Sequence, residues 1–102
     1  MSPGDSPSRK QKSKTVRRKV TILNSRGLHA RAAAKFAKAA GGFESDIQVV
    51  KGDQTVSGLS IMGLMMLAAG PGCRLKIGAR GAQADDAVAA LADLIESKFA
   101  ED

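Results

Sequence analysis

The chain has 102 residues, no Trp, no Tyr and three Phe, so it suits one domain whose core consists mainly of aliphatic side chains. No segment is long and apolar enough to cross a membrane, and the first residues lack the apolar region of a secretory signal. The formal net charge of +6 raises the question of a nucleic-acid partner, which depends on where the charge lies.

The positive charge is concentrated near the N-terminus. Residues 1–19 contain seven basic residues and one acidic residue, whereas residues 20–102 contain nine of each. The composition of residues 1–15 predicts a disordered basic tail, which leaves a domain over 16–102. Such a tail could contact a phosphate backbone weakly, but the net charge of the remainder indicates no basic stripe, and no aromatic stacking platform is present. We therefore expect no nucleic-acid partner. The basic residues of the first 19 positions are Arg9, Lys10, Lys12, Lys14, Arg17, Arg18 and Lys19.

The first half of the domain alternates between strands and a helix. A β-branched strand is predicted over 17–23, followed by a turn and a helix over 30–40 that the glycine pair 41–42 ends. Alternating β-branched residues predict a strand over 46–52, which forms a hairpin with a shorter strand over 55–58.

The second half contains two further helices and one strand. A helix follows Ser60 and ends at the Gly-Pro-Gly sequence 70–72, and a strand is predicted over 74–80. The last helix has the clearest apolar stripe, formed by Val88, Leu91, Ala92, Ile95 and Phe99. The order βαββαβα indicates an α+β fold with one antiparallel sheet covered by helices on one side.

His29 is the only histidine, and it directly precedes the helix predicted over 30–40. The first-turn N–H groups of a helix carry partial positive charge, so those of Ala30, Arg31 and Ala32 would favour a phosphate and a neutral imidazole. The Arg31 guanidinium could hold phosphoryl oxygens, and the alanines at 32–34 would leave room for a partner. This set suits a histidine that accepts and donates a phosphoryl group. A surface or capping role for His29 remains the alternative at this point.

Ser60 also stands before a predicted helix, where its hydroxyl would act as an N-cap. The same position tolerates a phosphate, so phosphorylation is the second possibility. The lone Cys73 cannot form an internal disulfide, which agrees with a cytoplasmic location, and we interpret it as a small apolar residue rather than a redox centre. One histidine and one cysteine provide no metal cluster, and no nucleotide-binding motif is present, so we expect no cofactor.

The methionines of the segment after Ser60 allow two interpretations. Met65 falls on the predicted core stripe with Ile61, whereas Met62 and Met66 lie on the other side. Core filling is the default for such residues, and an exposed docking surface is the alternative.

Two motifs together resemble a known family. The sequence GLHAR at 27–31 follows a strand, and LSIMGLMML occupies 59–67. Both are similar to motifs of HPr, the histidine-containing phosphocarrier family of the bacterial phosphotransferase system, and the resemblance extends from residue 16 to the C-terminus. It implies an open-faced β-sandwich, in which a four-stranded antiparallel sheet carries three helices on one face.

The resemblance also implies functional roles. His29 matches the histidine that enzyme I phosphorylates at Nδ1, Arg31 matches the arginine beside it, and the phosphoryl group then passes to a histidine of enzyme IIA. Ser60 matches the regulatory serine of HPr kinase/phosphorylase. Ile61, Met62 and Met65 match the apolar patch through which members of the family dock enzyme I and enzyme IIA. We expect a cytoplasmic monomer that carries phosphate without a cofactor, rather than a free-standing enzyme.

Two positions depart from the family pattern. Ala32 stands where proline is common, and Leu59 stands where lysine often precedes the serine. Both departures favour the nitrogen-related or regulatory branch over the sugar-transport branch. Two alternatives stay open: a regulatory module whose phosphorylation is read by partners without onward transfer, and a nucleic-acid binder that uses the basic tail.

Overall fold

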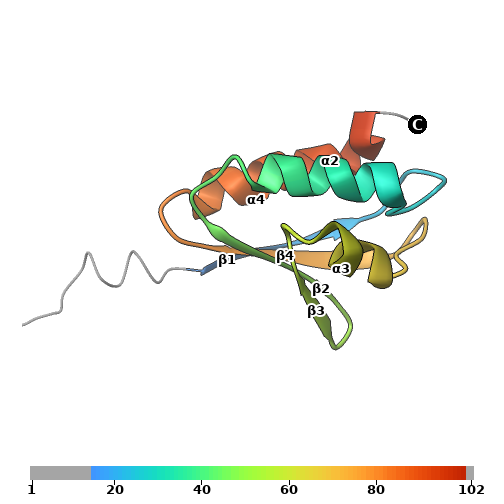
Figure 1. Ribbon diagram of the computed structural model, residues 1–102, viewed down its shortest axis with the longest axis horizontal. Helices are drawn as coiled ribbons and strands as arrows, with labels where there is room; N and C mark the ends of the chain where they lie inside the picture. The colour runs from blue at the N-terminus through green and yellow to red at the C-terminus, as the bar shows by residue number, and fades with distance from the viewer. Residues whose placement is uncertain (1–14, 101–102) are drawn as a thin grey trace, which may run out of the picture.

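The computed structural model describes residues 15–100 as one antiparallel sheet with helices on one face (Figure 1). The strands are β1 (Thr15–Thr21), β2 (Asp46–Lys51), β3 (Gln54–Ser57) and β4 (Arg74–Arg80), in the spatial order β1-β4-β2-β3. The helices are α2 (Ala30–Ala40), α3 (Ile61–Met66) and α4 (Ala84–Glu96), followed by the short 3₁₀ turn η1 (Lys98–Ala100). The expected α+β fold is confirmed, while the basic tail predicted over 1–15 lies, except for its last residue, outside the described residues.

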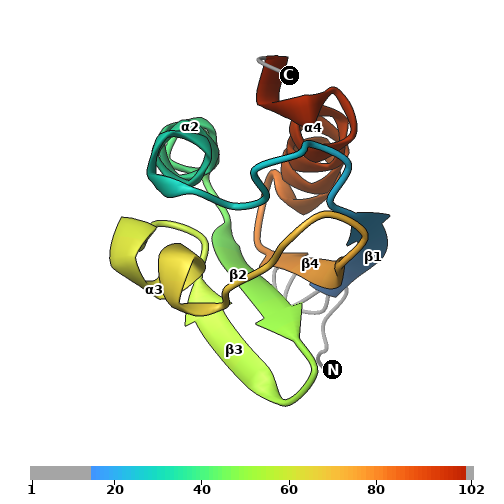
Figure 2. The same cartoon turned by 90° about the vertical axis from the view of Figure 1, so that its right-hand side faces the viewer.

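Strand β4 holds the sheet together because it pairs antiparallel with both β1 and β2. Its side chains alternate, so Leu75, Ile77 and Ala79 are buried under the helices while the residues between them face away. The opposite face carries no helix, as Figure 2 shows. Within residues 15–100, no helix is long and apolar enough to span a bilayer.

The apolar stripe predicted for the last helix is buried, but its last residue, Phe99, is not part of that helix. Helix α4 ends at Glu96, and Phe99 lies in a left-handed turn with φ 57°. Its side chain is fully buried, and its carbonyl oxygen accepts a hydrogen bond from Lys35 Nζ at 2.9 Å. The turn thus returns the chain to the core where a continued helix was expected.

The predicted core role of the methionines is wrong. Helix α3 is only six residues long, and Leu64 is its one buried residue. Ile61 and Met65, expected on the core stripe, are 44% and 41% exposed, and Met62 and Met66 are each 71% exposed. A helix this short at the edge of the sheet covers the core with one turn and leaves its remaining side chains in solvent.

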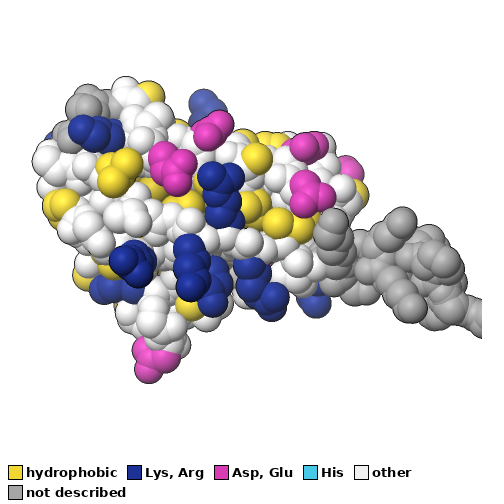
Figure 3. All heavy atoms as spheres, turned by 180° about the vertical axis from the view of Figure 1, so that it is seen from behind, with side chains coloured by type: hydrophobic (Ala, Val, Ile, Leu, Met, Phe, Trp, Pro, Cys, Tyr) yellow, Lys and Arg dark blue, Asp and Glu magenta, His cyan; other side chains and the backbone are white. Residues whose placement is uncertain are grey.

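The prediction that the folded part of the chain has no basic stripe is also wrong. Pairing of β1 with β4 brings basic residues from distant parts of the sequence onto the uncovered face of the sheet. Figure 3 shows Lys and Arg side chains gathered along the lower part of the molecule, with most Asp and Glu side chains above them. The net charge of residues 20–102 could not predict this clustering, because a sum of charges carries no information on which residues share a face. The basic residues on this face are Arg17, Lys19, Arg74, Lys76 and Arg80.

Candidate functional site

The loop between β1 and α2 has a shape that depends on Asn24 and Gly27. Asn24 is buried, and its Nδ2 donates a hydrogen bond to the Gly27 carbonyl at 2.7 Å. Gly27 has φ +66°, and a Cβ placed there would collide with the Ala69 carbonyl oxygen and lie 2.8 Å from Gly70 Cα. Glycine is therefore required both by the left-handed backbone and by the lack of space. The sequence predicted a turn here, and the Asn-x-x-Gly spacing was the available signal for the buried asparagine.

Backbone hydrogen bonds attach this loop to the segment that follows α3. The Leu28 N–H donates to the Ala69 carbonyl at 2.8 Å, and the Ile22 N–H donates to the Cys73 carbonyl at 2.9 Å. Cys73 is half-buried and packs against the core beside β4, as expected of a small apolar residue. Figure 2 shows the start of α2 and helix α3 at the same end of the molecule.

His29 is the N-cap residue of α2. Its backbone is extended, with φ −76° and ψ 178°, and its carbonyl accepts the Ala33 N–H at 2.8 Å. The imidazole is half-buried and makes no capping hydrogen bond, and no acidic side chain lies in the first turn. The ring thus lies at the positive end of an 11-residue helix without serving as its cap.

The residues after His29 divide between solvent and core. Ala30 and Arg31 are exposed, so the guanidinium group is carried on the outside of the first turn. Ala32 and Ala33 are fully buried, and the expectation that they leave room for a partner is wrong. Helical spacing turns these two methyl groups toward the sheet. The helix nevertheless starts at Ala30, so alanine in place of proline at Ala32 has not shortened it.

Helix α3 is capped at both ends. The Ser60 hydroxyl accepts the Gly63 N–H at 2.9 Å, which confirms the predicted N-cap. At the other end, Lys51 Nζ donates to the Leu67 carbonyl at 2.8 Å. Sequence reasoning missed Lys51, because nothing local indicates that a strand residue reaches a helix end 16 positions further along.

An exposed apolar surface surrounds Ser60 and continues along α3. We call it the α3 patch, and its members are between 41% and 71% exposed. No acidic residue lies in the first turn of α3 and no basic residue in its last turn. The three expected docking residues thus share one uncharged surface at the end of the molecule that carries His29. The α3 patch consists of Leu59, Ile61, Met62, Met65 and Met66.

Comparison with known proteins agrees with this architecture. The family described as "PTS HPr component phosphorylation site" matches residues 16–97. The phosphocarrier protein HPr of Neisseria meningitidis is 45% identical over 86 residues, which cover 84% of this chain and 97% of that protein. The phosphocarrier protein NPr of Shewanella violacea is 42% identical over 86 residues, covering 84% and 94%.

A solved structure supports the same assignment. The crystal structure of an HPr from Thermoanaerobacter tengcongensis superimposes with a TM-score of 0.81 at 44% sequence identity, covering 85% of this chain and 98% of that one. The family match over residues 16–97 includes the loop before α2 and helix α3. The chain therefore belongs to the HPr family of phosphocarrier proteins of the phosphotransferase system.

Proposed function

We propose that His29 takes a phosphoryl group from a phosphohistidine of enzyme I and passes it to a histidine of enzyme IIA. In the first step Nδ1 of the neutral imidazole attacks phosphorus, and the N–P bond to the donor histidine breaks as the new one forms. The donor ring keeps the electron pair of the broken bond, and the second step repeats this exchange on the acceptor. The observation that carries the proposal is that the half-buried His29 is the N-cap residue of α2, at the positive end of that helix.

The surrounding groups would stabilise the transferred oxygens. The backbone N–H groups of Ala30, Arg31 and Ala32 belong to the first turn, and the exposed Arg31 side chain adds a full positive charge. In enzymes, removing one such preorganised donor slows the chemical step about 10²–10³-fold. For a carrier the stabilisation has to remain moderate, because the phosphohistidine must stay reactive toward the next protein.

The α3 patch supplies the docking surface in this proposal. Ile61, Met62 and Met65 would contact enzyme I and enzyme IIA, and unbranched methionine side chains adapt to more than one partner. The area available on one short helix suits a transient complex that buries less than about 1,200 Å². We expect the protein to act as a monomer at this surface.

Ser60 would serve as the regulatory position. An HPr kinase/phosphorylase would place a phosphate with nearly two negative charges at the start of α3, where the Gly63 N–H now bonds to the hydroxyl. The phosphate would lie against the uncharged α3 patch and repel an acidic partner surface. Phosphorylation of Ser60 would therefore slow the transfer to His29.

The acceptor is tested by incubation with enzyme I and phosphoenolpyruvate, followed by intact-protein mass spectrometry. We expect one acid-labile phosphate on the wild-type chain and none on His29→Ala, because His29 is the only histidine. The matched control is Lys38→Ala, at an exposed residue in the last turn of α2, and this variant should be phosphorylated normally. An acid-labile phosphate on His29→Ala would refute the assignment.

The destination of the phosphate is tested with the purified phosphorylated protein. Ala32, Leu59 and the similarity to an NPr support the nitrogen-related branch, so phosphate should pass faster to a nitrogen-related enzyme IIA than to a sugar-specific one. Faster transfer to the sugar-specific protein would contradict this branch. Retention of the phosphate in the presence of every enzyme IIA would favour the regulatory module instead.

A further inference from the structure

The uncovered face of the sheet carries a continuous group of positive charges, here called the basic face. On β4 its members alternate with buried residues and point away from the helices. On β1, Arg18 pairs with Glu96 of α4 on the helical side, so its neighbours Arg17 and Lys19 point to the uncovered side. Asp46, opposite Arg80 at one end, is the one acidic side chain among the outward-facing strand positions described. The face therefore has a net charge of about +4, whereas the residues from 20 onward balance. The basic face consists of Arg17, Lys19, Arg74, Lys76 and Arg80.

The register places like charges directly against each other. Lys19 is the cross-strand partner of Lys76, and Arg17 and Arg74 occupy the next outward positions on either side. Neighbouring strands lie about 4.8 Å apart and alternate residues about 6.8 Å apart, so each of these charges lies within about one Debye length of its nearest neighbour at physiological salt. Like charges directly opposite in a sheet destabilise it, and a bound anion would remove that repulsion.

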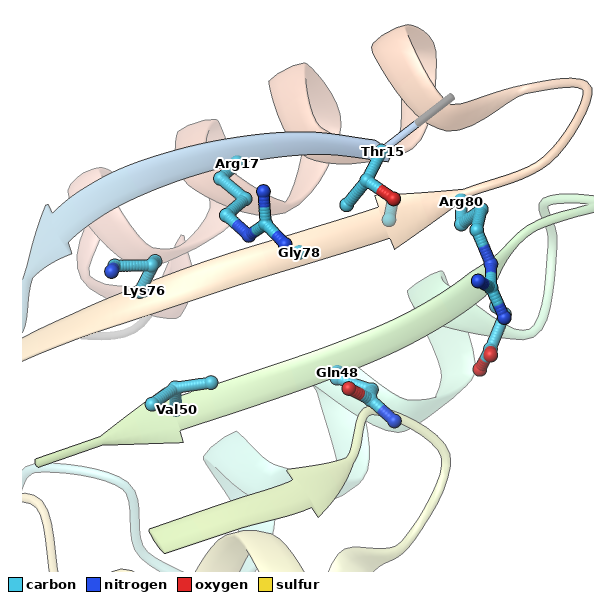
Figure 4. Close-up of a pocket in the computed structure, with 9 residues that line it drawn as sticks. Thr15, Arg17, Gln48, Val50, Lys76, Gly78 and Arg80 are labelled. Atoms are coloured by element: carbon cyan, nitrogen blue, oxygen red, sulfur yellow. The ribbon is translucent and has the colours of Figure 1, made fainter. Parts of the chain in front are cut away.

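The surface between the charges is hollow and polar. A hollow of about 210 Å³ lies over β1, β4 and β2, lined by Arg17, Gln48 and Arg80 among others. Figure 4 shows the Arg17 side chain extending across β4 at Gly78. A Cβ at Gly78 would lie 4.0 Å from Arg17 Cγ, so the Arg17 side chain passes over Gly78 at about van der Waals distance.

The chemistry of the face selects among anionic partners. The large exposed apolar side chains of the described residues are Leu23 and the α3 patch, and none of them lines the hollow, where Val50 is the one large apolar side chain. One half-buried valine is too little apolar surface to insert into a membrane or to form the apolar centre typical of a protein interface. It has no aromatic side chain on which a base could stack. A chain of phosphates remains the partner that matches these features.

We propose that the basic face binds the phosphate backbone of nucleic acid without reading its sequence. This proposal replaces the expectation of no nucleic-acid partner, which rested on net charge and not on its distribution.

The test is fluorescence anisotropy of a labelled DNA duplex of arbitrary sequence with the full chain. Five phosphate contacts predict a slope of log affinity against log salt of about −4.5, or about a 500-fold loss between roughly 50 and 200 mM salt. The double reversal Lys19→Glu/Lys76→Glu should reduce the magnitude of the slope by about 2. The control Lys38→Glu/Lys98→Glu makes the same change of net charge at exposed positions on the helical side and should retain the wild-type slope.

A second variant separates binding from folding. Lys76→Glu alone creates an opposite-charge pair with Lys19, so the melting temperature should rise while DNA binding weakens. Replacing Arg9, Lys10, Lys12 and Lys14 with serine should leave DNA binding that Lys19→Glu/Lys76→Glu abolishes. Equal affinity of the face variant and its control would overturn the proposal. Loss of all binding on changing residues 1–14, or tighter binding to phosphatidylserine vesicles than to DNA, would overturn it as well.

Discussion

Replacing Gly27 with alanine tests whether the loop before α2 positions His29. Gly27 has φ +66° and lies against the backbone of Ala69 and Gly70, whereas Gly52 has φ +60° and nothing within 4 Å of an added Cβ. Gly52→Ala is therefore a matched control, because it imposes the same left-handed backbone on alanine without a collision.

The two substitutions should differ in their cost to stability. An L-residue in the left-handed region costs about 1–2 kcal/mol, and both variants bear this cost. At Gly27 the new methyl group meets backbone atoms, which cannot rotate away as a side chain can, so the two loops must separate. Overpacking of this kind adds about 1–3 kcal/mol, giving about 2–5 kcal/mol for Gly27→Ala against about 1–2 kcal/mol for Gly52→Ala.

Urea unfolding measures both costs, and the rate of phosphorylation by enzyme I measures the effect on the site. Separation of the loops would strain the Leu28 N–H bond to Ala69, one residue before His29. A displacement of about 1 Å can slow a reaction about 10²-fold, so Gly27→Ala should be phosphorylated much more slowly than Gly52→Ala. Equal losses of stability in the two variants, or a wild-type phosphorylation rate in Gly27→Ala, would refute the reasoning.

Four further substitutions, at three positions, test the caps and the surface. Ser60→Ala should lower the free energy of unfolding by about 1 kcal/mol, while Ser60→Asp keeps a capping acceptor and should instead slow phosphorylation by enzyme I. A wild-type rate for Ser60→Asp would count against docking at the α3 patch. Lys51→Met removes the donor to the Leu67 carbonyl and should cost about 1–2 kcal/mol and speed amide exchange in α3; unchanged exchange would contradict this. Arg18→Ala removes an ion pair in which an Arg18 guanidinium nitrogen lies 3.9 Å from a Glu96 carboxylate oxygen. The two side chains are 47% and 43% exposed, so the free energy of unfolding should change by less than about 1 kcal/mol.

Local periodicity was sufficient for most of the secondary structure. The helix expected over 30–40 and the strand expected over 74–80 have the observed limits, and the 46–52 strand is one residue shorter at its end. These patterns succeed because an amphipathic helix and a half-buried strand record in their own sequence which side faces the core. The position of His29 at a helix start followed from the same local signals.

Features that depend on which surfaces meet could not be predicted this way. The exposure of α3 depends on its position at the edge of the sheet. The left-handed turn at Phe99 places that side chain in the core and its carbonyl within reach of Lys35 on α2. Asn24 and Lys51 bond to backbone groups that only the folded chain brings within reach.

The amino-acid sequence alone determined the order of strands and helices, the family, and the position of His29 at the start of α2. Each of these can be recognised from short segments whose residues are close together in the chain. The tertiary structure decided the spatial order β1-β4-β2-β3, and with it the pairing of Lys19 with Lys76 across 57 positions of sequence. Strand pairing acts over such separations without leaving a local pattern, so the basic face became visible only when the sheet was assembled.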